Sequence, residues 1–296
     1  MGFVPDSAYN YYKMKLLQKA KAALVGPLAV AKSDDIPKGS QQITRDEINA
    51  LQGKAMRGKK GQPVPRETPD LTRKTTYIPE HIHGFNLHRK DIEALQLAGT
   101  VLPTAGSNAS NRAVLESVED MIFNGIDELN IKGIYADAGK SYAVTDNYEW
   151  NTTNGNPLND VVGMMGELTE DGLYGDAEKR LILSPKAYWA AHKTMPNSSL
   201  SFISQIALLF KNGMNDILLA PATANGGATI IPEDAGVLAA FDQEVAERYV
   251  EEEINLRQYA ENEDQMFPFN VVTYQSIDIH DVNGFVKLDN LIEPAA

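Results

Sequence analysis

Cysteine is absent from the 296-residue sequence. Disulfide bonds, thiolate metal sites and cysteine nucleophiles are therefore excluded, and the redox compartment stays open. Long apolar runs are missing too, because no stretch approaches the roughly 18 uninterrupted apolar residues that a membrane helix needs. The sequence predicts a soluble protein with no membrane-spanning helix.

Motifs for catalysis and cofactor binding are equally scarce. The sequence has no G-x-S-x-G elbow, no dinucleotide-binding glycine fingerprint and no H-E-x-x-H zinc motif. Gly139-Lys140-Ser141 resembles the end of a phosphate-binding loop, but that loop has a fixed length and needs a glycine where Ile134 stands. The sequence therefore predicts no catalytic residue, no cofactor and no metal.

Three of the five histidines, His81, His83 and His88, lie close together in the sequence. On a strand, His81 and His83 project from the same face, which is an arrangement that metal ligands use. Neutral histidine rings that pack and hydrogen-bond on a sheet or at an interface are the preferred interpretation. A metal site is the alternative.

Basic and acidic residues are segregated along the chain. Residues 1–90 contain 16 Lys and Arg against 8 Asp and Glu, a balance of +8. Residues 91–296 contain 11 against 32, a balance of −21, and the sum is the net charge of −13. A basic first third and an acidic body favour contacts between copies of the chain, and a basic arm for nucleic acid is the alternative.

The first third of the chain predicts a helix followed by a segment without a core of its own. Apolar residues at helical spacing favour an amphipathic helix over residues 8–25, ended by Gly26-Pro27. Residues 33–75 are polar, with several glycines and prolines. Such a segment is either disordered or an extended arm or loop that other subunits order.

The middle of the chain predicts a long amphipathic helix over residues 107–124, ended by Gly125 and followed by an elbow at Gly133. Further helices are expected over residues 157–172, 186–193 and 199–210. Strands are expected over residues 75–87, 141–144, 148–150, 180–183, 217–219, 229–231, 237–240, 248–253, 255–259, 269–279 and 284–288. Helices in the middle, with strands before and after, give an α+β fold class.

The order of these helices and strands over residues 75–290 resembles that of two related groups of proteins. They are the encapsulin and linocin-like proteins and the tailed-virus major capsid proteins (of phages or archaeal viruses), which share the Hong Kong 97 capsid fold. The resemblance is carried by a motif at the end of the long helix, by the elbow glycine, and by a motif that opens a later helix. Its fold-defining residues are Glu119, Asp120, Phe123, Gly125, Gly133, Pro185 and Tyr188.

This resemblance implies a fold with five parts. They are an N-terminal arm (residues 1–35), an extended loop, or E-loop (36–78), a peripheral domain with a long spine helix (79–144), an axial domain (145–240), and strands that return to the peripheral domain (241–296).

The resemblance also implies a major capsid protein that assembles through pentamers and hexamers into an icosahedral virion shell around double-stranded DNA, in the host cytoplasm. Scaffold, portal and decoration proteins are further expected partners. The alternative is an encapsulin nanocompartment around cargo enzymes. Residues 4–9 lack the Leu-Ala-Pro opening of encapsulins, no tryptophan precedes Trp150, and residues 265–296 are longer than the encapsulin ending. These departures favour the viral capsid.

Five basic side chains of the expected E-loop are the candidate inter-subunit contacts, as partners for Asp and Glu of the acidic body: Lys54, Arg57, Lys59, Lys60 and Arg66. Two other classes stay open. An enzyme would need a convergent polar constellation in a closed pocket, and a free nucleic-acid-binding protein conflicts with an acidic body that repels phosphate.

Overall fold

The computed structural model describes residues 24–33, 36–48, 68, 70–90, 103–145, 147–170, 172–196, 198–221, 230–259 and 266–293. The expected helix over residues 8–25 lies almost wholly outside these residues. So do the five candidate contacts Lys54, Arg57, Lys59, Lys60 and Arg66. None of the described helices is both long and apolar enough to cross a membrane.

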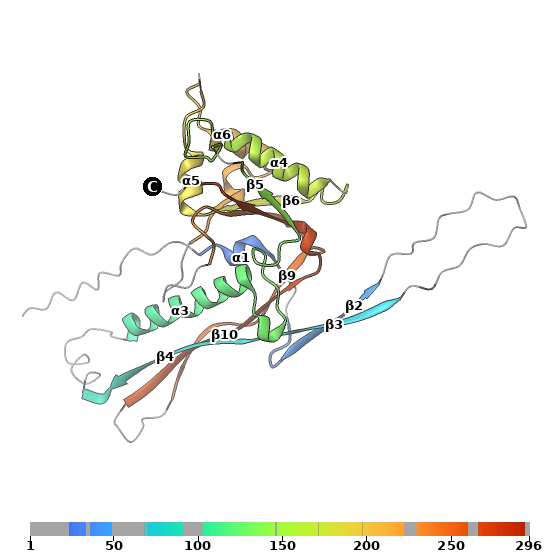
Figure 1. Cartoon of the computed structure of the whole chain (residues 1–296). Coiled ribbons are helices and arrows are strands. Elements are labelled where there is room, and N and C mark those ends of the chain that lie inside the picture. Colours follow the sequence, from blue (N-terminus) through green and yellow to red (C-terminus); the bar gives the residue numbers. More distant parts are fainter. Residues whose placement is uncertain are drawn as a thin grey trace, which may run out of the picture.

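Two β-sheets and a separate two-stranded ribbon organise the chain (Figure 1). The first sheet has the order β1-β9-β10-β4, with β1 Ala31–Lys32, β4 Glu80–His88, β9 Ala246–Gln258 and β10 Met266–Ile279. The second has the order β5-β11-β8-β6-β7, with β5 Lys140–Ala143, β6 Glu178–Leu183, β7 Ile217–Leu219, β8 Gly236–Phe241 and β11 Phe285–Asp289. The ribbon pairs β2 Gln42–Ile48 with β3 Leu71–Tyr77.

The long helix α3, Pro103–Asn124, lies along the first sheet and contacts β4 and β10 (Figure 1). Its buried side chains Val114, Val118, Met121 and Ile122 recur at the spacing that puts them on one helix face. The helix starts four residues before the expected residue 107, because Pro103 is accommodated at the first helical position, where no N–H is needed. A short helix, α1 Gly26–Ala29, packs beside α3.

Three helices follow in this part of the chain: α4 Pro157–Thr169, α5 Pro185–Ala191 and α6 Phe202–Ile206. α4 contacts β5 and β11, α5 contacts β6, and α6 packs against α4. Two of them begin with proline after a side-chain cap, from Asn156 and Ser184. Val161, Met164 and Leu168 of α4 are fully buried, whereas Val162 is half exposed. Val162 lies about 100° around the helix from buried Val161, which takes it past the edge of the buried stripe. Short 3-10 turns follow α6: η3 Ala207–Leu209 and η4 Gly213–Asp216.

The α+β class is confirmed, and several element boundaries are corrected. The strand expected over residues 75–87 is two strands, β3 and β4, separated at Ile78 and Pro79. The strands expected over 248–253 and 255–259 are one strand, β9, whose pairing with β10 shifts register near Tyr274. Gly26-Pro27 opens the short helix α1, and the helix expected over residues 199–210 is only α6 and η3.

Two expected strands are wrong, since residues 148–150 and 230–231 are irregular or lie in turns and bends. The C-terminal region, expected to extend beyond an encapsulin-like ending, contains β10 and β11, which are central strands of the two sheets.

Candidate assembly surfaces

The elbow after α3 closes the helix end with backbone hydrogen bonds. Gly125 has a φ of +75°, and its N–H donates to Met121 O over 2.9 Å. A residue in the left-handed conformation commonly ends an α-helix in this way. The N–H groups of Ile134 and Tyr135 then donate to the helix carbonyls of Ile122 and Phe123, each over 2.9 Å. These bonds satisfy acceptors that a helix end otherwise leaves open.

Glu119, Asp120, Phe123, Gly125 and Gly133 therefore lie together at the C-terminal end of α3 and in the elbow. Phe123 is fully buried, and Asp120 Oδ1 accepts a hydrogen bond from Asn124 Nδ2 over 2.7 Å. Glu119 is wholly buried, and its carboxylate accepts the N–H groups of Val25 and Gly26. Burial raises the pKa of Glu119 to about 7, against the lowering effect of these two hydrogen bonds.

The histidines of β4 attach this strand to α3. His81 Nδ1 is hydrogen-bonded to Ser117 Oγ over 2.9 Å, and His83 Nδ1 to Ser110 Oγ over 3.0 Å. Burial lowers the pKa of His81, which favours the neutral ring. Within the described part of the chain, no three His, Cys, Asp or Glu side chains are grouped so that they could hold a metal ion. The packing interpretation of His81 and His83 accounts for their contacts.

The ribbon of β2 and β3 projects from the body and is attached at its base (Figure 1). Arg45 Nε lies 2.8 Å from Asp278 Oδ2 at the end of β10, and Arg45 Nη2 lies 2.9 Å from Glu47. Lys74 Nζ lies 2.8 Å from the same Glu47. Arg45, Lys74 and Asp278 line a polar cavity of about 470 Å³ between the ribbon, the elbow and the end of β10. Of these pairs, Arg45–Asp278 joins the ribbon to the body, and Ser276 Oγ donates a hydrogen bond to Tyr77 O over 2.7 Å at the same place.

Pro185 and Tyr188 lie at the second sheet, in α5, apart from the other fold-defining residues. Tyr188, Trp189 and His192 contact one another, with ring centroids 4.9–5.6 Å apart. Trp189 is 65% exposed, although it is a large apolar side chain held in place by two neighbouring rings. Trp189 could not be identified from the sequence, because helical spacing gives no sign that a residue beside a core position is left uncovered.

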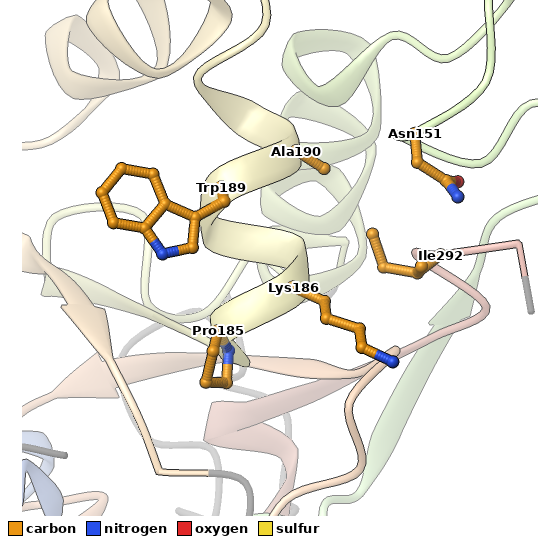
Figure 2. Close-up of a pocket in the computed structure, with 6 residues that line it drawn as sticks. All are labelled: Asn151, Pro185, Lys186, Trp189, Ala190 and Ile292. Atoms are coloured by element: carbon orange, nitrogen blue, oxygen red, sulfur yellow. The ribbon is translucent and has the colours of Figure 1, made fainter. Parts of the chain in front are cut away.

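An open hollow of about 420 Å³ adjoins α5. Figure 2 shows Trp189 projecting from one side of α5, with Asn151 and Ile292 near the other. The residues that line the hollow are Asn151, Pro185, Lys186, Trp189, Ala190 and Ile292. Further large apolar side chains of the same part of the chain are at least 40% exposed: Leu200, Leu208, Leu209 and Met214. Contiguous exposed apolar surface marks contact sites between proteins, which makes these side chains candidates for such a site.

Strand β9 carries three successive glutamates, Glu251, Glu252 and Glu253, which are acidic partners for a basic loop. Glu253 is 71% exposed at the side chain and pairs with Lys32 over 3.3 Å, and Glu252 pairs with Arg257 over 2.6 Å. Pairing of these or other carboxylates with the five basic loop residues stays a prediction.

Comparison with known proteins identifies the relatives of this chain. The family model described as encapsulating protein for peroxidase matches residues 38–258. A diheme-cytochrome-encapsulin shell fusion protein of Kuenenia stuttgartiensis is 27% identical over 148 residues, which are 48% of this chain and 39% of that protein. The chain thus spans well under half the length of this relative.

Solved structures share the fold at low sequence identity. The capsid of the Myoviridae phage XM1 has a TM-score of 0.69 and 11% identity, covering 98% of this chain and 99% of that chain. The capsid of a native GTA particle has a TM-score of 0.68 and 11% identity, covering 93% of each chain. The virus-like particle from Pyrococcus furiosus has a TM-score of 0.62 and 16% identity, covering 88% of this chain and 91% of that chain. The chain belongs to the family of encapsulating, linocin-like shell proteins, built on the Hong Kong 97 capsid fold.

Proposed function

We propose that this shell-forming chain assembles through pentamers and hexamers into a closed icosahedral shell, with a structural and not a catalytic role. The observation that carries the proposal is the family match over residues 38–258, on a chain with the capsid fold. The projecting ribbon of β2 and β3 and the exposed apolar side chains around α5 are the surfaces that such an assembly uses.

Assembly depends on many modest contacts. The ribbon lies across a neighbouring subunit, and Lys54, Arg57, Lys59, Lys60 and Arg66 of its loop pair with carboxylates of that neighbour. Trp189 and the hollow beside it contribute apolar contact around the symmetry axes. Multivalent contacts of this kind sum to a stable shell even when each one is weak.

Viral DNA is the first candidate content, with the virion as location and assembly in the host cytoplasm. It is supported by the N-terminal departures from encapsulins: residues 4–9 lack the Leu-Ala-Pro opening, and no tryptophan precedes Trp150. The length of residues 265–296 no longer supports it, because β10 and β11 belong to the core of the fold. Scaffold, portal and decoration proteins are the partners that this candidate requires.

Cargo enzymes are the second candidate content. The description of the matching family names an encapsulating protein for peroxidase, and the curated relative is an encapsulin shell fusion. Both similarities are at the level of sequence, which supports a protein compartment as the alternative to a virion.

Particle size and content test the proposal together. The purified chain is imaged by negative-stain microscopy, and native particles are assayed for nuclease-protected DNA and for co-purifying proteins. Closed shells, or rings of five or six, are expected. Protected DNA of uniform length supports the virion, and a stoichiometric enzyme without DNA supports the compartment. A monodisperse monomer or dimer at high concentration and with added scaffold contradicts the shell.

A further inference from the structure

Val25 and Gly26, at the start of α1, lie directly against α3. Glu119 Oε1 accepts the N–H of Val25 over 2.9 Å, and Glu119 Oε2 accepts the N–H of Gly26 over 2.7 Å. The carboxylate is completely buried. Val25 offers α1 no side-chain cap, so Glu119, more than 90 residues along the chain, binds the free N–H groups at the start of this helix.

The contact between Glu119 and Gly26 leaves no room for a side chain at residue 26. A Cβ on Gly26 would lie 2.7 Å from Glu119 Oε2 and 3.2 Å from Ile122 Cδ1, so a side chain at residue 26 displaces the carboxylate. The chain that follows is fixed independently, because β1 pairs with β9 and the N–H of Ser33 donates to Arg248 O over 2.9 Å. The Glu119 contact is thus the first strong attachment of the chain after residue 24.

We infer that Glu119 is a positioning residue for the N-terminal arm: by binding Val25 and Gly26, it sets the point and the direction in which residues 1–24 leave the body. These residues contain four lysines, at positions 13, 15, 19 and 21, and one acid, Asp6, a balance of +3. The inference concerns the single subunit and is independent of what the shell encloses.

The same contact responds to pH. Burial raises the pKa of Glu119 from 4.5 to about 7, and the charged side chain that acts on it is Arg112, which is itself paired with Glu116. Residues of α1 carry no charge. Opening the contact lets water reach the carboxylate and lowers its pKa toward 4.5, so opening releases a proton and becomes easier as pH rises. With these two pKa values, the opening equilibrium increases about tenfold between pH 6 and pH 8.

Hydrogen–deuterium exchange of the full-length protein tests this inference. Exchange of a peptide covering residues 25–31 is measured at pH 6, 7 and 8 and corrected for the chemical exchange rate at each pH. The wild type is compared with Glu119→Gln and with the control Asp120→Asn, which removes the neighbouring acid of the same helix without touching the arm. A peptide from β10 serves as the internal reference.

The wild type and Asp120→Asn are expected to show about tenfold more opening at pH 8 than at pH 6. Glu119→Gln is expected to open more than the wild type at pH 6 and to lose the pH profile, because its amide nitrogen cannot accept the second N–H. Opening in Glu119→Gln equal to that of the wild type at pH 6 overturns the inference, and so does a pH profile retained in this variant.

Gly26→Ala is the second variant, and it decides the question if Glu119→Gln does not fold. It keeps the carboxylate but displaces it from the arm, so faster exchange is expected in residues 25–31 while the α3 peptides stay protected. Unchanged protection of residues 25–31 in Gly26→Ala contradicts the role of Glu119.

Discussion

At the end of α3 the backbone of Gly133 lies so close to the helix that no side chain fits. A Cβ at this position would lie 2.3 Å from Phe123 O and 2.5 Å from the carbonyl carbon of Asn124. These atoms are backbone and cannot move aside as the end of a flexible side chain can. Because the backbone at Gly133 lies this close to the end of α3, the N–H groups of Ile134 and Tyr135 reach the helix carbonyls.

Gly133→Ala is therefore expected to destabilise the subunit strongly, by about 3 kcal/mol or more, since overpacking forces backbone shifts. Gly166→Ala is the matched control, because Gly166 lies in the exposed part of α4 and a Cβ there meets no atom within 4 Å. The control should be stabilised by up to about 1 kcal/mol through helix propensity. Urea unfolding followed by tryptophan fluorescence measures both. Equal stability of the two variants contradicts the role of the elbow.

His81 gives the subunit a pH dependence whose sign follows from its burial. Burial lowers its pKa below the ordinary 6.5, so the folded protein prefers the neutral ring. Its contribution to stability is present above pH 6.5 and is lost as pH falls below that value, because the unfolded chain then binds the proton more readily. We expect the urea midpoint of the wild type to fall more steeply from pH 7 to pH 5 than that of His81→Gln.

The control is His83→Gln, which changes the more exposed histidine of the same strand face. The steep fall should persist in this variant. If His81→Gln and the wild type lose stability in parallel as pH decreases, His81 is not the group responsible.

At the scale of elements, prediction from the sequence succeeded where the signal is local. The helix end at Gly125 and the elbow at Gly133 follow from short spacing, and so do proline-opened α4 and α5. Contacts between distant residues left no such sign: the acceptor of the Val25 N–H is Glu119, and the partner of Arg45 is Asp278. Strand ends were also missed where one long strand carries a register shift, as β9 does opposite Tyr274.

The ribbon of β2 and β3 is an element that cannot be stable by itself, since an isolated two-stranded hairpin is marginal in water. Arg45→Gln leaves Asp278 nearly buried without its cation, and breaking such a pair costs about 3 kcal/mol. We expect a lower melting temperature and fewer closed shells. Arg73→Gln, on the same ribbon, breaks an exposed pair with Asp46 and should leave the melting temperature nearly unchanged. Equal effects of the two variants would show that the base of the ribbon has no special role.

Substitution of Trp189 tests whether α5 takes part in assembly. Because the side chain is 65% exposed, Trp189→Ala should leave the melting temperature of the isolated subunit within about 1 °C. Its loss from a contact between copies should reduce shell yield several-fold, as expected for a tryptophan at an interface centre. Trp189→Phe keeps a ring and should retain most of the yield. Normal shell yield with Trp189→Ala contradicts a contact at this site.

At the scale of the whole molecule, the separation of charge makes assembly depend on salt. Residues 1–90 carry a balance of +8 and residues 91–296 one of −21, so copies attract each other where the first third of one meets the body of the next. Attraction between exposed charges is screened beyond about 8 Å at physiological ionic strength. Shells held in this way should therefore dissociate, or assemble more slowly, as salt increases.

Replacing Lys54, Arg57, Lys59 and Lys60 together by glutamine separates the loop from the rest of this charge. We expect fewer shells at low salt and a weaker dependence of assembly on salt than in the wild type, measured by light scattering between 50 mM and 500 mM NaCl, a range over which the screening length falls to about 4 Å. The control replaces Lys13, Lys15, Lys19 and Lys21 by glutamine, the same loss of four charges from the arm. If both variants respond to salt alike, the attraction comes from net charge alone. If only the loop variant loses the dependence, the loop carries the contact between subunits. Unchanged assembly in the loop variant removes these lysines and Arg57 from the interface.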